Sequence, residues 1–273
     1  MSKLQNRDWL LAFEPLKDAV RRRPRTDKDG PKMKLDLRST LQKLSETALV
    51  RPAAYMVKRL GFRQDVITRV KFLAAEDSAR YVLDTMMPCA IYDDRYPLFD
   101  LAIRQAPPEG LFVEFGVFNG KSINYVARKS GRQIYGFDSF EGLAEDWGGT
   151  GLLKGRFDLG GRLPRVESNV KLLKGWFNEV LPGFLEAHPG PIAFAHMDAD
   201  TYESTKYVLD LISDRFRVGT VVQFDEYLGY PAWRTGEFLA WQNLCKERGI
   251  QYKYLGVGWL SVAVEITGIS SGR

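Results

Sequence analysis

The segment that most constrains the fold of this chain is residues 111–122, Leu-Phe-Val-Glu-Phe-Gly-Val-Phe-Asn-Gly-Lys-Ser. Its opening apolar run, Leu111 to Val113, is too short for a helix and predicts a buried parallel strand. Gly116 and Gly120 follow, and the residues after Ser122 suit a helix. A strand, a glycine turn and a helix bring backbone N–H groups and a helix N-terminus up to a ligand. The segment therefore predicts the ligand-binding corner of an open α/β sheet.

A second apolar run, Ile134 to Phe137, follows this helix and ends in Asp138. In nucleoside-binding sheets an acidic residue at the tip of the second strand holds the ribose hydroxyls. We therefore expect Asp138 to bind the ribose of a nucleoside-containing ligand.

Three ligand classes compete for this corner. A P-loop needs four residues between its glycine and its Gly-Lys pair, but only three separate Gly116 from Gly120. A dinucleotide fingerprint needs glycine at position 118, where this chain has Phe118. S-adenosylmethionine carries an adenosine and a charged amino acid but no phosphate, so it tolerates a side chain at 118. It also suits Glu114, which a phosphate would repel.

The sequences Val-Glu-Phe-Gly-Val-Phe-Asn-Gly-Lys-Ser and Tyr-Gly-Phe-Asp-Ser-Phe-Glu-Gly-Leu resemble class I S-adenosylmethionine-dependent methyltransferases. The similarity is greatest to the macrocin O-methyltransferase group and covers roughly residues 95–267. That group in turn resembles the metal-dependent catechol O-methyltransferases. The resemblance implies S-adenosyl-L-methionine as the cofactor, with Phe140 or Trp176 stacked on its adenine. The expected cofactor-binding residues are Glu114, Gly116, Gly120, Ser122, Asp138, Phe140 and Trp176.

The pattern from residue 109 onward predicts an α/β fold. It alternates strands and helices, as in a doubly wound, Rossmann-like, mostly parallel sheet. Two adjacent strands, 251–257 and 259–267, predict an antiparallel C-terminal hairpin and bring the expected number to seven. We expect three regions: a basic arm (1–38), a helical cap or oligomerisation region (39–108) and the methyltransferase domain (109–273). Helices expected at 39–60, 65–87 and 95–105 form the N-terminal extension, which covers the active-site mouth or pairs two protomers.

Two groups of carboxylates follow neighbouring strands, in His196-Met-Asp198-Ala-Asp200 and in Asp225-Glu226. Ligands of open α/β sheets bind beyond the carboxyl ends of the strands, where these acids would converge. Clustered buried acids repel one another and a divalent cation relieves the repulsion; an all-oxygen set favours Mg²⁺. The resemblance places the metal ligands at Asp198, Asp225 and Glu226. The family more often has Asp or Asn at position 226, so Asp200 is a substitute ligand, or else the cap of the following helix.

The expected reaction is in-line transfer of the sulfonium methyl group to a hydroxyl that the metal positions and acidifies. His196 and Asp198 are the expected catalytic residues, since they point to one face of their strand. The alternative for His196 is a satisfied core histidine. The glycine-rich segment 139–163 predicts a lid or a tolerated surface insertion. With it, the acceptor pocket is expected to contain Tyr227, Tyr230, Trp233 and Arg234.

Charge and composition limit the other functions. The net charge of +5 belongs wholly to residues 1–40, so the catalytic region lacks the basic stripe of a nucleic-acid enzyme. No apolar stretch is long enough to span a bilayer and no signal-peptide pattern is present, so a cytoplasmic location is expected. The expected partner is a small hydroxylated molecule of sugar or natural-product type, and a homo-oligomer through the N-terminal helices is an option. The alternatives are a non-catalytic binding module on a degenerate methyltransferase fold and an NAD-dependent oxidoreductase.

Overall fold

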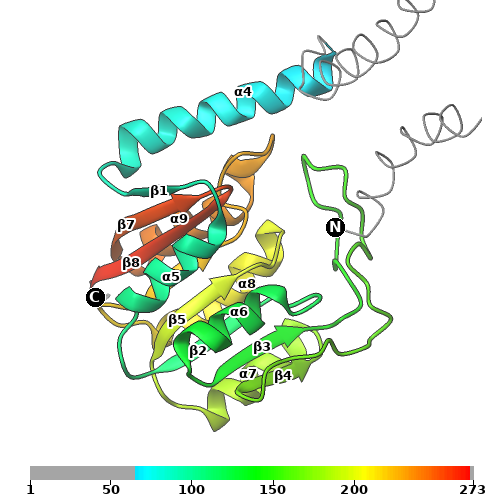
Figure 1. Cartoon of the computed structure of the whole chain (residues 1–273), viewed down its shortest axis with the longest axis vertical. Helices are drawn as coiled ribbons and strands as arrows, with labels where there is room; N and C mark the ends of the chain where they lie inside the picture. Colours follow the sequence, from blue (N-terminus) through cyan, green and yellow to red (C-terminus); the bar gives the residue numbers. More distant parts are fainter. Residues whose placement is uncertain (1–64, 271–273) are drawn as a thin grey trace, which may run out of the picture. The chain divides into compact units, whose positions relative to one another are not determined.

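A computed structural model describes residues 65–270, which form a mixed α/β sheet with helices on both faces (Figure 1). The predicted arm over 1–38 and the predicted helix over 39–60 lie outside the described residues, and the division of the chain at 38 and 108 stays a prediction. The strands are β1 (Ala90–Tyr92), β2 (Leu111–Phe115), β3 (Ile134–Asp138), β4 (Val170–Lys174), β5 (Ile192–Met197), β6 (Val221–Phe224), β7 (Ile250–Gly258) and β8 (Ser261–Ile269). The α-helices are α4 (Val66–Tyr81), α5 (Arg95–Gln105), α6 (Lys121–Ser130), α7 (Phe177–Ala187), α8 (Tyr202–Ile212) and α9 (Glu237–Arg248). Shorter helical turns are η2 (Val82–Met86), η3 (Ser213–Arg215) and η4 (Trp233–Thr235).

The strands lie in the order β1-β7-β8-β6-β5-β2-β3-β4. β8 runs antiparallel to both of its neighbours, β6 and β7, and the other neighbouring pairs are parallel. The order reverses between β2 and β5, so the carboxyl ends of these two strands open a crevice at the switch point. The predicted fold class, a mostly parallel doubly wound sheet with an antiparallel C-terminal hairpin, is confirmed.

The sheet has eight strands, one more than the seven predicted, because β1 extends its edge. β1 pairs in parallel with the glycine-containing end of β7, with Ala90 opposite Gly256. A Cβ atom on Gly256 would lie 3.0 Å from the carbonyl oxygen of Ala90, so the close pairing depends on glycine. Three residues are too few to show a strand's alternation, which is why the sequence pattern did not reveal β1.

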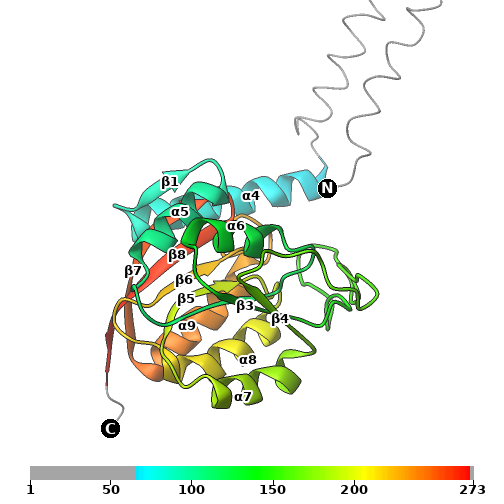
Figure 2. The same cartoon turned by 60° about the horizontal axis from the view of Figure 1, so that its bottom comes forward.

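Two helical layers cover the two faces of the sheet, with α5 and α6 on one side and α7, α8 and α9 on the other (Figure 2). Along β2 the side chains alternate between them: Phe112 packs with the α5 and α6 cluster, whereas Val113 and Phe115 pack with the opposite cluster. A strand buried on both faces is apolar throughout, as the sequence of β2 is apart from Glu114. The core therefore fixes the strand ends that carry the polar residues.

Helix α4 is anchored to the sheet domain near its C-terminal end. The carboxylate of Asp77 accepts hydrogen bonds from the indole of Trp233 (3.0 Å) and from the guanidinium of Arg234 (2.9 Å). The hydroxyl of Ser78 accepts a hydrogen bond from the backbone N–H of Gly229 (2.9 Å). Within residues 65–270 no helix is long and apolar enough to cross a membrane.

Candidate active site

The glycine turn between β2 and α6 lies directly against the end of β5. Gly116 has a φ of 90°, and a Cβ atom there would lie 1.7 Å from the backbone carbonyl oxygen of Asp198. Gly120 precedes α6 with a φ of 77°. Both conformations favour glycine, and at Gly116 the close approach excludes any side chain. The turn therefore brings the backbone of Gly116 to the crevice, whereas Gly120 is not among the residues that line the cavity described below.

Asp138, at the tip of β3, ties this turn to the neighbouring strand. Its Oδ2 accepts hydrogen bonds from the backbone N–H groups of Val117 (2.8 Å) and Phe118 (2.7 Å), and its Oδ1 accepts one from Phe140 (2.6 Å). Each carboxylate oxygen has two lone pairs, so acceptor capacity remains for a ligand hydroxyl. Asp138 lines the cavity described below, in the position expected of a ribose-binding residue.

Glu114 and Ser122 lie behind the turn and contact each other. The hydroxyl of Ser122 donates to Oε1 of Glu114 (2.8 Å), and Oε2 of Glu114 lies 3.1 Å from Nδ1 of His196. Glu114 is fully buried, and neither it nor Ser122 lines the cavity. These two predicted cofactor-binding residues therefore support the turn from inside the protein.

A cavity of about 240 Å³ opens at the carboxyl ends of β2, β3, β4, β5 and β6. It brings together predicted residues from all five strand ends: Gly116, Asp138, Trp176, Asp198, Asp225 and Glu226. Of the two aromatic residues proposed to stack on adenine, Trp176 lines the cavity, whereas Phe140 is only 1% exposed and packs in the core on the α5 and α6 side. Phe140 has a φ of 59°, and its backbone N–H donates to Asp138. The structure thus places Trp176, and not Phe140, at the cavity wall.

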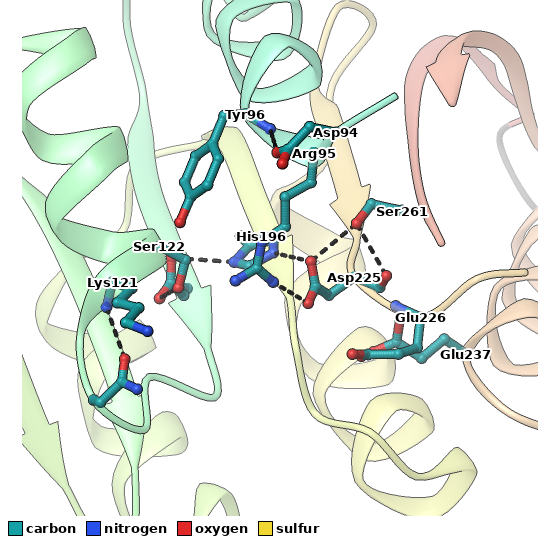
Figure 3. Close-up of polar contacts among 12 residues, drawn as sticks. Asp94, Arg95, Tyr96, Lys121, Ser122, His196, Asp225, Glu226, Glu237 and Ser261 are labelled. Atoms are coloured by element: carbon teal, nitrogen blue, oxygen red, sulfur yellow. Dashed lines mark hydrogen bonds and ion pairs between the residues drawn. The ribbon is translucent and has the colours of Figure 1, made fainter. Parts of the chain in front are cut away.

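His196 is enclosed between two carboxylates (Figure 3). Its side chain is 0% exposed, with Nε2 lying 3.7 Å from Oδ1 of Asp225 and its ring 4.8 Å from the ring of Phe99. Burial alone would lower its pKa, but the contacts with Asp225 and Glu114 raise the pKa to about 10. His196 does not line the cavity, and its two ring nitrogens make ion-pair contacts with Glu114 and Asp225 but no well-aligned hydrogen bond within residues 65–270.

Asp225 is held by two side chains besides the imidazole. The guanidinium of Arg95, the first residue of α5, donates to Oδ2, and the hydroxyl of Ser261 donates to Oδ1 (3.0 Å), as Figure 3 shows. Burial would raise the pKa of Asp225, but His196 and Arg95 hold it well below the usual range. Asp225 therefore stays ionised in a site where it is only 3% exposed.

The other acids of the cluster experience the opposite effect. Burial, and then repulsion from neighbouring carboxylates, raise the pKa values of Asp198, Asp200 and Glu226 well above their usual range. Glu237, at the start of α9, is fully buried; its Oε2 accepts from the backbone N–H of Glu226 (3.2 Å), and burial raises its pKa to about 8. Oε2 of Glu226 and Oε1 of Glu237 are buried without a hydrogen-bond partner in the described part of the chain.

These carboxylates are suited to a hard divalent cation. Donor atoms of Asp198, Asp200 and Glu226 lie within 4.8 Å of one another, as do those of His196, Asp198 and Asp225. Asp198 belongs to both groups, but Asp225 and Glu226 do not share one, so the predicted set Asp198, Asp225 and Glu226 does not close within this distance in the described part of the chain. Carboxyl oxygens without partners beside mutually repelling acids are what Mg²⁺ or a similar ion would satisfy.

Comparison with known proteins assigns this region to a family. Residues 113–227, the segment from β2 to just past β6, match the family model described as a methyltransferase domain. This part of the chain is a methyltransferase domain. The predicted class I methyltransferase fold is thereby confirmed, and the matched segment contains the glycine turn, Asp138 and the acids that follow β5 and β6.

A curated relative of this methyltransferase domain comes from Streptomyces olivaceus and is named 8-demethyl-8-(2,3-dimethoxy-alpha-L-rhamnosyl)-tetracenomycin-C 4'-O-methyltransferase. The two sequences are 31% identical over 144 residues, which cover 43% of this chain and 53% of the relative. The chain thus spans about half the length of this relative.

Solved structures of similar fold include the O-methyltransferase NovP, with 22% identity and a TM-score of 0.50 over 64% of this chain and 80% of that chain. Another is the calicheamicin methyltransferase CalS11, with 22% identity and a TM-score of 0.47 over 89% of this chain and 98% of that chain. The likeness to NovP concerns the fold.

Sequence reasoning missed two charged residues of this methyltransferase site, Arg95 and Glu237. Arg95 lies in a helix that the pattern placed outside the domain, 130 residues before its partner Asp225. Glu237 stands directly after Gly236 at the start of a predicted helix, where a glutamate is ordinary on the surface. No local signal distinguishes either residue from solvent-exposed charges.

Proposed function

We propose that this protein is an S-adenosylmethionine-dependent O-methyltransferase that acts, with a divalent cation, on a hydroxyl group of a small glycoside or related natural product. The observation that carries the proposal is that four features line one cavity: a glycine turn that matches no phosphate-binding motif, Asp138 at the end of β3, the ring of Trp176, and a cluster of carboxylates. The name of the Streptomyces olivaceus relative, which specifies O-methylation of a rhamnosyl tetracenomycin, supports the acceptor class. A cytoplasmic location and assembly through the N-terminal helices remain predictions.

The cofactor would occupy the cavity beside the glycine turn. Asp138 would accept a hydrogen bond from one ribose hydroxyl through Oδ1, and Trp176 would lie against the adenine. The backbone at Gly116 and Gly120 would face the methionine part, while Glu114 and Ser122 hold the turn from behind. This arrangement would place the sulfonium methyl group toward the carboxylates that follow β5 and β6.

A bound Mg²⁺ would be held by Asp198 and Glu226, with Asp225 or Asp200 as the third ligand, and it would supply a Lewis acid that positions the acceptor hydroxyl and lowers its pKa. Methyl transfer forms a bond from the acceptor oxygen to the methyl carbon as the carbon–sulfur bond breaks, and the sulfur keeps the electron pair. The hydroxyl proton passes to a carboxylate, for which Asp200 is placed because it borders both this cavity and the neighbouring hollow. Catalysis rests on orientation of the two reactants.

The test is thermal unfolding of the purified chain with S-adenosylhomocysteine, with and without Mg²⁺, and with NAD⁺ for comparison. A ligand at a hundred times its dissociation constant stabilises by roughly 2.7 kcal/mol, which raises Tm by a few degrees for a protein of this size. We expect a rise with S-adenosylhomocysteine that is lost in Asp138→Ala. No rise with S-adenosylhomocysteine, or a rise with NAD⁺ alone, would overturn the proposal.

A further inference from the structure

A second hollow, of about 190 Å³, adjoins the cofactor cavity and shares Asp200 with it. One wall comes from the glycine-rich segment, with Glu145, Asp146 and Trp147. The facing wall comes from the start of α8 and from the segment after β6, with Glu203 and Tyr230. The hollow therefore lies where the second substrate would meet the methyl donor.

The walls of this hollow are closely fitted to each other. A Cβ atom on Gly149 would lie 2.4 Å from Cβ of Ala232, so the glycine-rich segment packs tightly against the segment after β6. A Cβ atom on Gly236 would lie 2.1 Å from the hydroxyl of Tyr230, which fixes that ring. The rings of Trp147 and Tyr230 are 5.8 Å apart at an angle of 70°. The hollow therefore has tightly packed walls, with the rings of Trp147 and Tyr230 at its base.

Two polar groups at this base point to a ligand. Trp147 and Tyr230 are more than nine-tenths buried, and neither the indole N–H nor the phenol O–H makes a well-aligned hydrogen bond among residues 65–270, although the indole N–H lies close enough to the phenol oxygen to oppose the rise in the pKa of Tyr230 that burial causes. Buried donors of this kind are normally satisfied. A hydroxylated ligand offers the oxygen atoms that would satisfy them.

The charge of the lining is one-sided. Within the described part of the chain, eight carboxylates and a single cationic side chain, Arg95, border the two hollows. Four of these carboxylates border the second hollow: Glu145, Asp146, Asp200 and Glu203. That cation is already paired with Asp225. Arg234, which the sequence placed near the acceptor, is bound to Asp77 and does not border either hollow.

The N-terminus of α8 also faces the second hollow, and by itself it would favour an anion. Its cap is occupied, because the hydroxyl of Thr201 accepts from the backbone N–H of Ser204 (3.3 Å), and Glu203 adds a negative charge in the first turn. Carboxylates accept hydrogen bonds from hydroxyl and ammonium groups, but they repel phosphate.

Building on the proposed function, we propose that this second hollow is the acceptor site, and that it selects neutral or amine-bearing glycosides and rejects acceptors that carry phosphate, such as nucleoside diphosphate sugars. Methylation would then follow the step in which a glycosyl transfer reaction has removed the nucleotide from the sugar.

The test uses three panels built on the same set of sugars: methyl glycosides, amino-deoxy methyl glycosides and nucleoside diphosphate sugars. Transfer of labelled methyl from S-adenosylmethionine is measured with Mg²⁺ on the full chain, and S-adenosylhomocysteine binding is measured in parallel by calorimetry. We expect kcat/KM at least about tenfold higher for a member of the first two panels than for its nucleotide counterpart, since like charges oppose binding. Equal or preferred use of nucleoside diphosphate sugars, or no use of any panel while S-adenosylhomocysteine binds, overturns the inference. Loss of S-adenosylhomocysteine binding itself would instead overturn the proposed function.

A paired variant tests the role of charge directly. The double variant Glu145→Gln/Glu203→Gln should have a lower KM for nucleoside diphosphate sugars, so that the ratio of kcat/KM for glycosides to kcat/KM for these sugars falls severalfold. Its affinity for S-adenosylhomocysteine should be unchanged. The matched control is Glu186→Gln, an exposed carboxylate on α7 that borders neither hollow. A preference that stays at the wild-type value in the double variant would show that the wall carboxylates do not set it.

Discussion

The guanidinium of Arg95 donates a hydrogen bond to the carboxylate of Asp225, which lies 130 residues further along the chain. Among residues 65–270, Arg95 is the only cationic side chain that borders the cofactor cavity, and Asp225 is one of the predicted metal ligands. The carboxylate of Asp225 is therefore shared between an internal cation and the site proposed for an external one. The pair links the start of α5 to the end of β6 and offsets part of the cluster's negative charge.

Arg95→Met should have opposite effects on folding and on cation binding. In EDTA, removing one partner of a largely buried pair should lower the free energy of unfolding by about 3 kcal/mol. Removing a positive charge beside the proposed metal site should tighten Mn²⁺ binding about tenfold. Urea unfolding measures the first quantity and calorimetric titration with Mn²⁺ the second.

Arg95→Lys is the control for that experiment, because it keeps the charge and loses only the planar guanidinium. It should bind Mn²⁺ with nearly wild-type affinity. Weaker or unchanged Mn²⁺ binding in Arg95→Met would show that Arg95 does not compete with the cation.

Gly116→Ala should abolish S-adenosylhomocysteine binding or prevent folding. The added Cβ atom would lie 1.7 Å from the carbonyl oxygen of Asp198, so the glycine turn and the end of β5 would have to move apart. Gly131→Ala, at the C-cap of α6, is the matched control. Its φ of 64° is also left-handed, but no atom lies within 4 Å of the added group. Gly131→Ala should lower the free energy of unfolding by about 1 kcal/mol and leave S-adenosylhomocysteine binding intact. Equal behaviour of the two variants would contradict a role for the close approach.

The site residues that could be predicted from the sequence are those whose role follows from their position directly after a strand. Gly116, Asp138 and Asp198 each stand at the end of a recognisable strand, and parallel strand ends meet at one edge of a sheet. The roles of Arg95 and Glu237 depend on tertiary contacts with residues that follow β6, so no local pattern reveals them. The choice between Phe140 and Trp176 likewise depended on the path of the chain after each strand.

His196 should make stability depend on pH in the alkaline range. Its folded-state pKa is raised to about 10 from 6.5, so its stabilising contribution is complete below pH 6.5 and is lost as pH rises toward 10. Unfolding by urea in EDTA should show a fall of a few kcal/mol across this window. His196→Gln should be less stable at pH 6 and should show a flatter profile. An unchanged slope in the variant would mean that another group titrates there.

Substitution of Asp200 should affect proton transfer, and substitution of Glu226 should affect cation binding. Asp200 borders both hollows, whereas Glu226 borders the cofactor cavity and has a buried oxygen that no hydrogen bond from residues 65–270 reaches. Asp200→Asn should lower kcat by about a hundredfold, the usual contribution of a general base, with Mn²⁺ affinity changed little.

Glu226→Gln should instead weaken Mn²⁺ binding at least about tenfold, since the variant keeps the shape of the side chain and loses the charged ligand. Both variants should retain S-adenosylhomocysteine binding, because neither side chain belongs to the glycine turn or to the β3 tip. Calorimetry with each ligand, together with single-turnover methyl transfer, distinguishes the outcomes. If Asp200→Asn lost the cation and Glu226→Gln kept it, Asp200 would be the third metal ligand, and the proton would have to leave by another group.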